Sequence, residues 1–348
     1  MKRESVIIRA ERRKTVGGHF GILVHGGHVA KPKNPREVAF YQRMDNELKP
    51  FTPAFCNEIL VHAATDSETE RVLVFTSSVP KCHGDKVAEN PESIVRFRTY
   101  MPGFAAVETN DSWNSQADEC QSKVVENLLQ YGPKDFMLLE KCGRTFCATI
   151  RPGSEKLGPV LRQHGDNSSK EKREQAILKC KLSTSGKLGA RLVGMQMYDA
   201  TNKEYVYIEK QEGRTMSAEQ FFVYCGGFAK ACGPLRSLKI RDKLQALKNV
   251  LMNLEGYRFF SASILVAFDA EAVDSADEDA VCVKLIDFAN STLPGFFSDI
   301  VHGGVDDGGI WGVENIIKAM EIEPDSAPTE SSSFQRGGFS AVDGVLQN

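Results

Sequence analysis

The stretch Val281-Cys282-Val283-Lys284-Leu285-Ile286-Asp287-Phe288 is a mainly apolar run that carries an acidic residue near its end. A second apolar run, residues 258–268, precedes it, and the acidic segment 269–279 separates the two. Runs of this length that are rich in β-branched and aromatic residues and bounded by polar segments are typical of buried strands. We therefore expect two neighbouring strands, with Asp287 at the end of the second.

The length and composition of the chain favour two lobes. A chain of 348 residues, 41% hydrophobic and 26% charged, has the composition of an ordinary globular protein and is too long for one small core. We expect an α+β fold with antiparallel sheets, made of an N-terminal lobe (1–140) with a polar insertion at about 66–127 and a C-terminal lobe (141–322). The Ser-, Pro-, Thr- and Gly-rich tail, residues 323–348, is expected to be disordered.

The remaining pattern gives a few local elements. A strand is expected at residues 29–31, a helix from Arg36, and a short buried strand at 136–139 that ends at Glu140, where a hinge between lobes belongs. Leucines and valines at helical spacing predict a core-packing helix over about 241–254, ended by Gly256.

Charge and cysteine usage narrow the cellular setting. The net charge of −3 gives no general attraction to nucleic acid or to an anionic membrane. Nine cysteines lie without a CxxC spacing, which favours a reduced intracellular compartment over a zinc or disulfide framework. No segment approaches the roughly 20 apolar residues of a membrane span. We expect a cytosolic or nuclear protein that does not bind nucleic acid.

Two single residues suit phosphate chemistry. Asp287 at a strand end is well placed to bind Mg²⁺, which prefers oxygen ligands, although an aspartate there can instead cap the next turn. Lys31 follows the strand-like Val29-Ala30 and could reach nucleotide phosphates, although a lysine before proline can equally be solvated surface.

Positive charge is concentrated in residues 162–191, which carry eight basic and three acidic residues, a net charge of +5. A Ser-x-x-Glu pattern at 168–171 starts a helix there, and Lys172 and Lys179 share one face with Arg173 beside them. Such a cluster could bind a ligand with several phosphates, or it could be a solvated helix face. The common nucleotide motifs GxxxxGK[ST] and GxGxxG are absent, as are the HRD and APE elements of protein kinases.

Several ordered segments together resemble the inositol polyphosphate kinase family, and especially the inositol hexakisphosphate kinases. The segments are Arg162-Gln163-His164-Gly165-Asp166, Lys179-Cys180, Ser183-Thr184-Ser185, Leu188-Gly189-Ala190-Arg191, Gly194-Met195-Gln196-Met197-Tyr198, Tyr257 to Leu265, Ile286-Asp287-Phe288-Ala289, Val301 to Asp306 and Gly312 to Ile316. The resemblance implies a two-lobed kinase with an ATP cleft between the lobes and antiparallel sheets.

The resemblance also implies roles for individual residues. Lys31 would contact ATP phosphates, Glu140 would lie at the adenine-facing hinge, and Asp287 would bind Mg²⁺ as the catalytic aspartate. Three basic residues would face the substrate, inositol hexakisphosphate or a less phosphorylated inositol: Lys172, Arg173 and Lys179. The implied activity is transfer of the ATP γ-phosphoryl group to give a diphosphoinositol phosphate.

One segment departs from the family. The P-x-x-x-D-x-K-x-G signature should precede Arg162, but residues 146–161 contain neither its Asp nor its Lys at the expected spacing. The best register puts Thr149, Arg151 and Gly153 at the D, K and G positions, with Lys156 a possible substitute for the lysine. The alternative to an active kinase is therefore a catalytically impaired relative that binds inositol polyphosphates or a protein partner.

Overall fold

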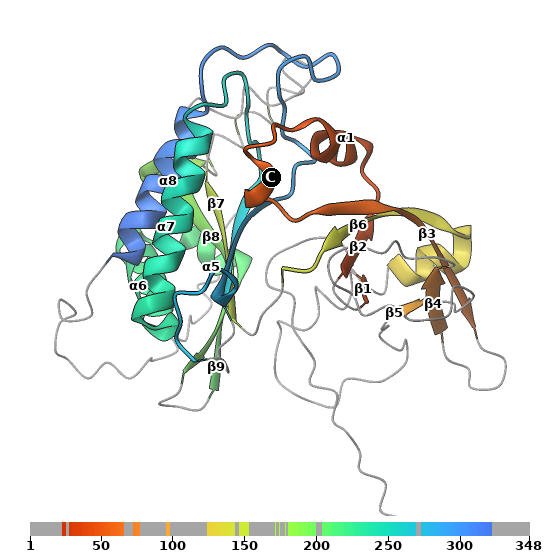
Figure 1. Ribbon diagram of the computed structural model, residues 1–348, viewed down its shortest axis with the longest axis horizontal. Helices are drawn as coiled ribbons and strands as arrows, with labels where there is room; N and C mark the ends of the chain where they lie inside the picture. The colour runs from red at the N-terminus through yellow and green to blue at the C-terminus, as the bar shows by residue number, and fades with distance from the viewer. Residues whose placement is uncertain are drawn as a thin grey trace, which may run out of the picture.

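The computed structural model contains two antiparallel sheets that lie side by side, with three long helices packed beside the second (Figure 1). The structure describes residues 23–25, 28–65, 72–76, 95–97, 124–142, 146–152, 171, 174, 178, 180–199, 204–268 and 273–321. A mixed α+β fold with antiparallel sheets is what the sequence predicts, and this prediction is confirmed.

The first sheet has six strands in the order β1-β2-β6-β3-β4-β5. Its strands are β1 (Leu23–His25), β2 (His28–Pro32), β3 (Phe55–Thr65), β4 (Val72–Thr76), β5 (Val95–Phe97) and β6 (Lys134–Glu140). A helical segment over 124–131 contributes Val125 and Leu128 to a small core with Leu23, Ala30, Phe136 and other side chains of this sheet. The register pairs Lys31 of β2 with Met137 of β6.

The second sheet has five strands in the order β11-β10-β7-β8-β9. Its strands are β7 (Phe146–Pro152), β8 (Ala190–Asp199), β9 (Glu204–Ile208), β10 (Ser263–Phe268) and β11 (Val281–Ile286). The expected pairing of the two late strands is confirmed, because β10 and β11 are antiparallel neighbours from Ser263–Ile286 to Phe268–Val281.

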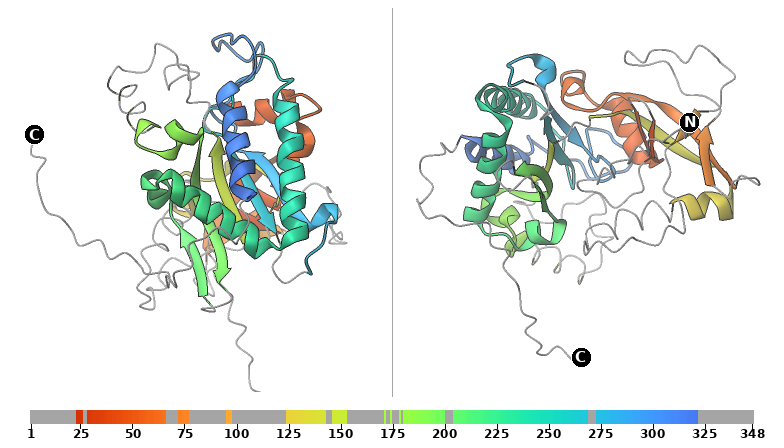
Figure 2. Two further views of the ribbon diagram at one scale, coloured as in Figure 1. Left: turned by 90° about the vertical axis from the view of Figure 1, so that its left-hand side faces the viewer. Right: turned by 90° about the horizontal axis from the view of Figure 1, so that it is seen from below.

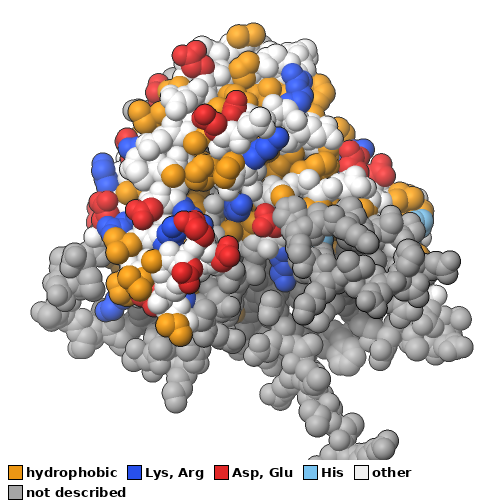
Figure 3. Space-filling model, in the orientation of Figure 1, with side chains coloured by type: hydrophobic (Ala, Val, Ile, Leu, Met, Phe, Trp, Pro, Cys, Tyr) orange, Lys and Arg blue, Asp and Glu red, His pale blue; other side chains and the backbone are white. Residues whose placement is uncertain are grey.

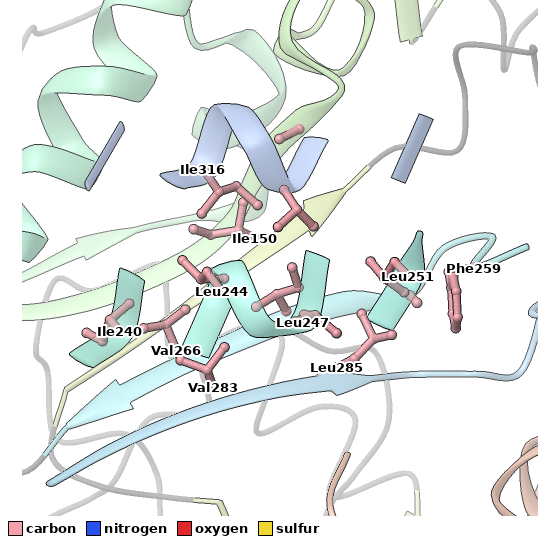
Figure 4. Close-up of a cluster of buried hydrophobic side chains, with 14 of the residues drawn as sticks. Ile150, Ile240, Leu244, Leu247, Leu251, Phe259, Val266, Val283, Leu285 and Ile316 are labelled. Atoms are coloured by element: carbon pink, nitrogen blue, oxygen red, sulfur yellow. The ribbon is translucent and has the colours of Figure 1, made fainter. Parts of the chain in front are cut away.

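Helices cover one face of the second sheet (Figures 1 and 2). They are α4 (Thr184–Leu188), α5 (Lys210–Thr215), α6 (Ala218–Cys232), α7 (Pro234–Leu251) and α8 (Asp307–Met320). Figure 4 shows how Leu244 and Leu247 of α7 meet Val266 of β10 and Ile150 of β7, with Ile316 of α8 beside them. All five side chains are fully or almost fully buried, which makes this interface the main core of the molecule.

Helix α1 (Pro35–Arg43) lies between β2 and β3 of the first sheet in the chain but packs into the core of the second. Phe40 is fully buried and stacks on Phe288 with ring centroids 4.5 Å apart. Arg36 forms two hydrogen bonds with Asp299, and Arg43 donates to the Gly295 carbonyl oxygen at 2.8 Å. Helix α1 therefore links the sheet that carries Lys31 to the part of the chain that carries Asp287.

The structure differs from the sequence-based expectations in several elements. The predicted strand 258–268 begins only at Ser263, because residues 258–262 form turns and one isolated bridge between Arg258 and Thr292. Helix α7 begins at Pro234 and ends at Leu251, several residues before Gly256. Within the segment 66–127, β4 coincides with the apolar run 72–75, and β4 and β5 extend the first sheet from β3. The tail 323–348 lies outside the described residues.

Acidic and basic side chains are interspersed over the described part of the face in Figure 3, with apolar side chains between them. Ion pairs among the described residues include that of Lys248 with Glu314 at 3.5 Å. Among the described helices, none is both long enough and apolar enough to span a lipid bilayer.

Candidate active site

Lys31, Glu37 and Asp287 form a partly buried cluster where the two sheets meet. Lys31 Nζ lies 2.9 Å from Glu37 Oε1 and 2.9 Å from Asp287 Oδ1. The Lys31 side chain is 11% exposed and that of Glu37 is 1% exposed, whereas that of Asp287 is 42% exposed. Two of the sequence-predicted site residues are thus in direct contact, and the aspartate remains accessible from solvent.

Each member of the cluster is positioned by its own element. Lys31 projects from β2, and Glu37 lies in the first turn of α1, which begins where the Asn34 side chain accepts hydrogen bonds from the Arg36 and Glu37 amides. An asparagine cap followed by proline is a typical helix start. Asp287 is the first residue after β11.

The backbone at Asp287 is strained. Its φ of 69° lies in the left-handed region, which costs a non-glycine residue about 1–3 kcal/mol. The next residue is held from two sides: the Phe288 amide donates to Glu37 Oε1 at 3.4 Å, and its ring stacks on Phe40. Such strain is concentrated at functional sites, where the surrounding packing maintains it.

The pKa values of the cluster reflect burial and charge. Burial alone would lower the pKa of Lys31, but the attraction of Asp287 and Glu37 outweighs it, and the net pKa is raised. Burial raises the pKa of Glu37, and Asp287 adds to this, while Lys31 opposes both. The lysine is therefore held as a cation.

Two buried polar atoms beside the cluster have no hydrogen-bond partner among the described residues: Glu37 Oε2 and the Tyr41 hydroxyl. Burial raises the pKa of Tyr41 well above its usual value, and the nearby charges of Glu37, Asp287 and Cys142 add to this effect. Buried polar atoms without a partner are costly, so these two atoms mark a place where water or a ligand can add hydrogen bonds.

Glu140, the third predicted residue, lies at the same junction but does not contact the lysine cluster directly in any hydrogen bond that the structure shows. Its backbone N–H donates to Ala54 O at 2.9 Å, and its Oε2 accepts from Ala54 N at 3.2 Å. Lys284 Nζ is 3.9 Å from the same Oε2 and donates to the carbonyl oxygens of Pro50 and Thr52. Glu140 and Lys284 thus connect the end of β6 to β11.

Strand β7 occupies the position where the departure from the family signature falls. The register pairs Thr149 with Leu265 of β10 and Arg151 with Arg191 of β8, and Ile150 between them is fully buried. Thr149 and Arg151 thus lie on a strand that is paired with a neighbour on each side.

The predicted substrate-facing residues Lys172, Arg173 and Lys179 lie outside the described residues, as do Gly153 and Lys156. Residues 171, 174, 178, 180 and 181 between and beside them are helical, as the capping pattern predicts.

Some residues that carry the family resemblance have structural roles. The Asp306 side chain caps α8 by accepting from Gly309 N and also accepts from Phe259 N at 3.0 Å. Arg258 donates to the carbonyl oxygens of Gly303 and Gly304. Two of the matching segments, Tyr257 to Leu265 and Val301 to Asp306, are thus held against each other.

A similar contact joins two other matching segments. Asn315 of α8 donates from Nδ2 to Leu188 O at 2.9 Å. The next residue, Gly189, ends α4 with a φ of 64°, and a Cβ atom there would lie 2.4 Å from the Trp311 ring. Only glycine fits this close approach of α4 to α8.

Sequence reasoning missed Glu37, Tyr41 and Lys284. Glu37 in the first turn of a helix is also favoured by the helix dipole, so its position alone does not indicate a site. Lys284 reads as the polar side of a strand with alternating burial. Only the contacts of α1 and β11 across the junction reveal these residues.

The chemistry of the donor set suits a hard divalent cation. Among the described residues, no group of three or more His, Cys, Asp or Glu side chains could hold a metal alone. Asp287 is nonetheless an accessible carboxylate, and Mg²⁺ commonly binds through one or two carboxylates together with substrate phosphates. The residues present therefore fit a cation that is delivered with a phosphate ligand.

The fold is similar to that of an inositol phosphate kinase of known structure. A solved structure of the inositol phosphate multikinase Ipk2 of S. cerevisiae, in complex with ADP and Mn²⁺, superposes with a TM-score of 0.50 over 85% of this chain and 98% of its own, at 19% identity. The model of the family described as inositol polyphosphate kinase matches residues 156–321, a range that begins at Lys156.

Curated relatives agree with this class. Inositol hexakisphosphate kinase 3 of Mus musculus is 27% identical over 87% of this chain and 91% of its own length. Inositol hexakisphosphate kinase 2 of Oryctolagus cuniculus is 28% identical over 89% of this chain and 94% of its own length. Inositol hexakisphosphate kinase 1 of Mus musculus is 28% identical over 88% of this chain and 91% of its own length. The resemblance to the inositol polyphosphate kinase family inferred from the sequence is confirmed.

Proposed function

We propose that this protein is an ATP- and Mg²⁺-dependent kinase that transfers the γ-phosphoryl group of ATP to an inositol polyphosphate. The observation that carries the proposal is the contact of Lys31 with both Glu37 and Asp287, since a lysine held by a helix glutamate beside a metal-binding aspartate recurs in kinase sites. The similarity to inositol polyphosphate kinases supports the same reaction.

The roles follow from the charges of the side chains. The Lys31 ammonium group would bind phosphate oxygens of ATP, and Glu37 would hold it in place after Asp287 turns to its cation. When bound, Mg²⁺ neutralises charge on the phosphate oxygens. Asp287 would hold this ion through its exposed carboxylate. Glu140 and the segment that follows would lie beside the adenine ring.

Inositol hexakisphosphate is the acceptor that we propose. The relatives compared above are inositol hexakisphosphate kinases, and the basic residues Lys172, Arg173 and Lys179 offer charge for a polyanion. A phosphate acceptor is already an anion at neutral pH, so it needs less help from a general base than a hydroxyl group does. Loss of the signature aspartate would therefore harm diphosphate formation less than it would harm phosphorylation of a hydroxyl group.

The second candidate function is binding without turnover, and it is favoured by β7, which has Thr149 and Arg151 where the family signature has Asp and Lys. Phosphoryl transfer depends mostly on alignment and charge neutralisation, so loss of a lysine near the transferring group is a serious defect.

The deciding experiment incubates the purified full chain with ATP, Mg²⁺ and inositol hexakisphosphate and separates the products by charge. A diphosphoinositol phosphate, absent without Mg²⁺, is the expected product. Binding of ATP and inositol hexakisphosphate is measured on the same preparation by calorimetry. Retained binding with no product would reject the kinase proposal in favour of the binding function, and absence of both would reject each of them.

A further inference from the structure

Two cysteines from distant parts of the sequence meet at the junction of the sheets. Cys142 lies two residues after the end of β6, and Cys282 is the second residue of β11. The Cys142 thiol donates to the Glu140 carbonyl oxygen at 3.8 Å, Lys284 of β11 lies 3.9 Å from the Glu140 carboxylate, and the side chains of Cys142 and Cys282 interact with each other. Both side chains are half-buried, so a small reagent in solution can reach the pair.

The surroundings make the two thiols unequal. The interaction with Cys142 lowers the pKa of Cys282, and the nearby Lys284 and Lys243 lower it further. Burial and the charge of Glu140 raise it, but they do not outweigh these effects. The same interaction and burial raise the pKa of Cys142. The charge of Glu140 raises it further, and the charge of Lys284 lowers it. A thiolate is the nucleophile in thiol chemistry, so Cys282 is the attacking member and Cys142 keeps its proton.

The two described cysteines of α6 lack these features. Cys225 and Cys232 of α6 are fully buried, and burial raises the pKa of each to about 12. Cysteines of that kind pack as small apolar side chains and react slowly. The pair at the junction combines access from solvent, a thiol neighbour and a lysine nearby.

The pair also lies beside the candidate active site. Cys142 is close enough to Tyr41 to influence the pKa of its hydroxyl, as Glu37 and Asp287 also do. Cys282 lies on the strand that leads directly to Asp287. A covalent bond between the cysteines would therefore tie the segment after β6 to the strand that presents the catalytic aspartate.

We propose that Cys142 and Cys282 are a dithiol modification site that low-molecular-weight disulfides, such as glutathione disulfide, convert to an intramolecular disulfide. The Cys282 thiolate attacks one sulfur of glutathione disulfide, the S–S bond breaks, and one glutathione thiolate leaves. Cys142 then loses its proton and attacks the Cys282 sulfur, which expels the second glutathione. Two protein thiols are oxidised, and one glutathione disulfide is reduced to two glutathione molecules.

The consequence for activity rests on the proposed function. If the segment after Glu140 receives the adenine ring, a bond from Cys142 to β11 restricts the place that the ring must enter. The disulfide is then expected to weaken nucleotide binding by about tenfold or more, a change of about 1.4 kcal/mol, and reduction with dithiothreitol is expected to restore it.

The test treats the full chain with glutathione disulfide and follows intact mass and disulfide-linked peptides. The expected product has lost two hydrogens, carries no glutathione and contains a Cys142–Cys282 peptide. Cys142→Ser should stop at a stable glutathione adduct on Cys282, because the resolving thiol is missing. Cys282→Ser should form neither product at this site. Cys147→Ser is a further control. Cys147 lies two strands away from Cys282 in the same sheet, because both residues pair with Ala267 of β10. This variant should form the same disulfide as the unaltered chain.

Three results would overturn the site: a linkage between other cysteines, a persistent adduct on Cys282 in the unaltered chain, or reaction of the pair no faster than that of Cys225. ATP binding is measured separately on reduced and oxidised protein. A linked protein that binds ATP as tightly as the reduced form overturns only the regulatory consequence. Reduced protein that does not bind ATP overturns the proposed function and leaves the peptide result to decide the dithiol site.

Discussion

Lys31 Nζ lies 2.9 Å from Asp287 Oδ1, a contact between residues 256 positions apart. Glu37 accepts from the same ammonium group, so one lysine joins β2, α1 and the end of β11. The contact places a cation and an accessible carboxylate at the same edge of the junction. Phosphate and a hard divalent ion are the ligands that such a pair can take together.

Asp287→Asn should abolish phosphoryl transfer while the protein stays folded. The amide keeps the size of the side chain but loses the charge that would hold the metal ion, and we expect a fall of at least about 10²-fold in the rate of product formation. The matched control is Asp279→Asn, an exposed aspartate just before β11, which should leave the rate unchanged. A variant at position 287 with full activity would refute the metal role of this residue.

The ion pair of Arg36 with Asp299 should stabilise the docking of α1. The two Arg36 nitrogens reach the two Asp299 oxygens at 2.9 and 2.6 Å, Nη2 also donates to Ser291 O at 3.2 Å, and the Asp299 side chain is 8% exposed. Asp299→Asn should lower the free energy of unfolding in urea by about 2 kcal/mol, because a largely buried guanidinium loses its charged partner.

A double-mutant cycle with Arg36→Met separates the pair from other effects. The matched control is Glu58→Gln, which removes the partner of Lys33 in a more exposed pair and should give no measurable change. Equal losses of unfolding free energy in Asp299→Asn and Glu58→Gln would show that burial does not strengthen the Arg36–Asp299 ion pair.

Phe40→Ala should destabilise the whole molecule rather than the first sheet alone. Phe40 is fully buried against Tyr257, Phe259, Phe288 and Phe296. Loss of a buried aromatic ring costs about 3–5 kcal/mol, and we expect this loss in urea unfolding followed by near-UV circular dichroism. Leu60→Ala, at a side chain that is 45% exposed, should stay within about 0.5 kcal/mol. A loss below about 1 kcal/mol at Phe40 would contradict the packing of α1 into the second core.

Stability should depend on the charge of Lys31 at high pH. The pKa of Lys31 in the folded protein is raised above its usual value of 10.5, so its stabilising charge is fully present below pH 10.5 and is lost as the pH rises through the folded-state pKa. We expect the difference in the free energy of unfolding between the unaltered chain and Lys31→Met to be constant from about pH 7 to 9.5 and to shrink above about pH 10.5.

The control for this titration is Lys230→Met at the exposed end of α6. The difference between this variant and the unaltered chain should show no comparable fall above pH 10.5. If the difference in the free energy of unfolding between the unaltered chain and Lys31→Met grows with pH, the raised pKa of Lys31 is contradicted.

The sequence alone determined much of the class of this protein. Alternation and β-branched content indicated β10 and β11, and the strand end at Asp287 was visible as an acidic residue after an apolar run. The ordered matching segments pointed to inositol polyphosphate kinases, a resemblance that the comparisons confirm. These signals are local, because composition, periodicity and short spacings depend on neighbours along the chain.

Only the tertiary structure decided which residues meet. Glu37 looked like an ordinary acidic residue in a first helical turn, and it became a site residue because α1 packs on Phe288 and brings it to Lys31. Cys142 and Cys282 showed no spacing that relates them, and they interact because the fold brings Lys284 of β11 to Glu140 at the end of β6. Pairings across such separations depend on how two sheets and one helix pack together, and a one-dimensional pattern carries no direct record of that packing.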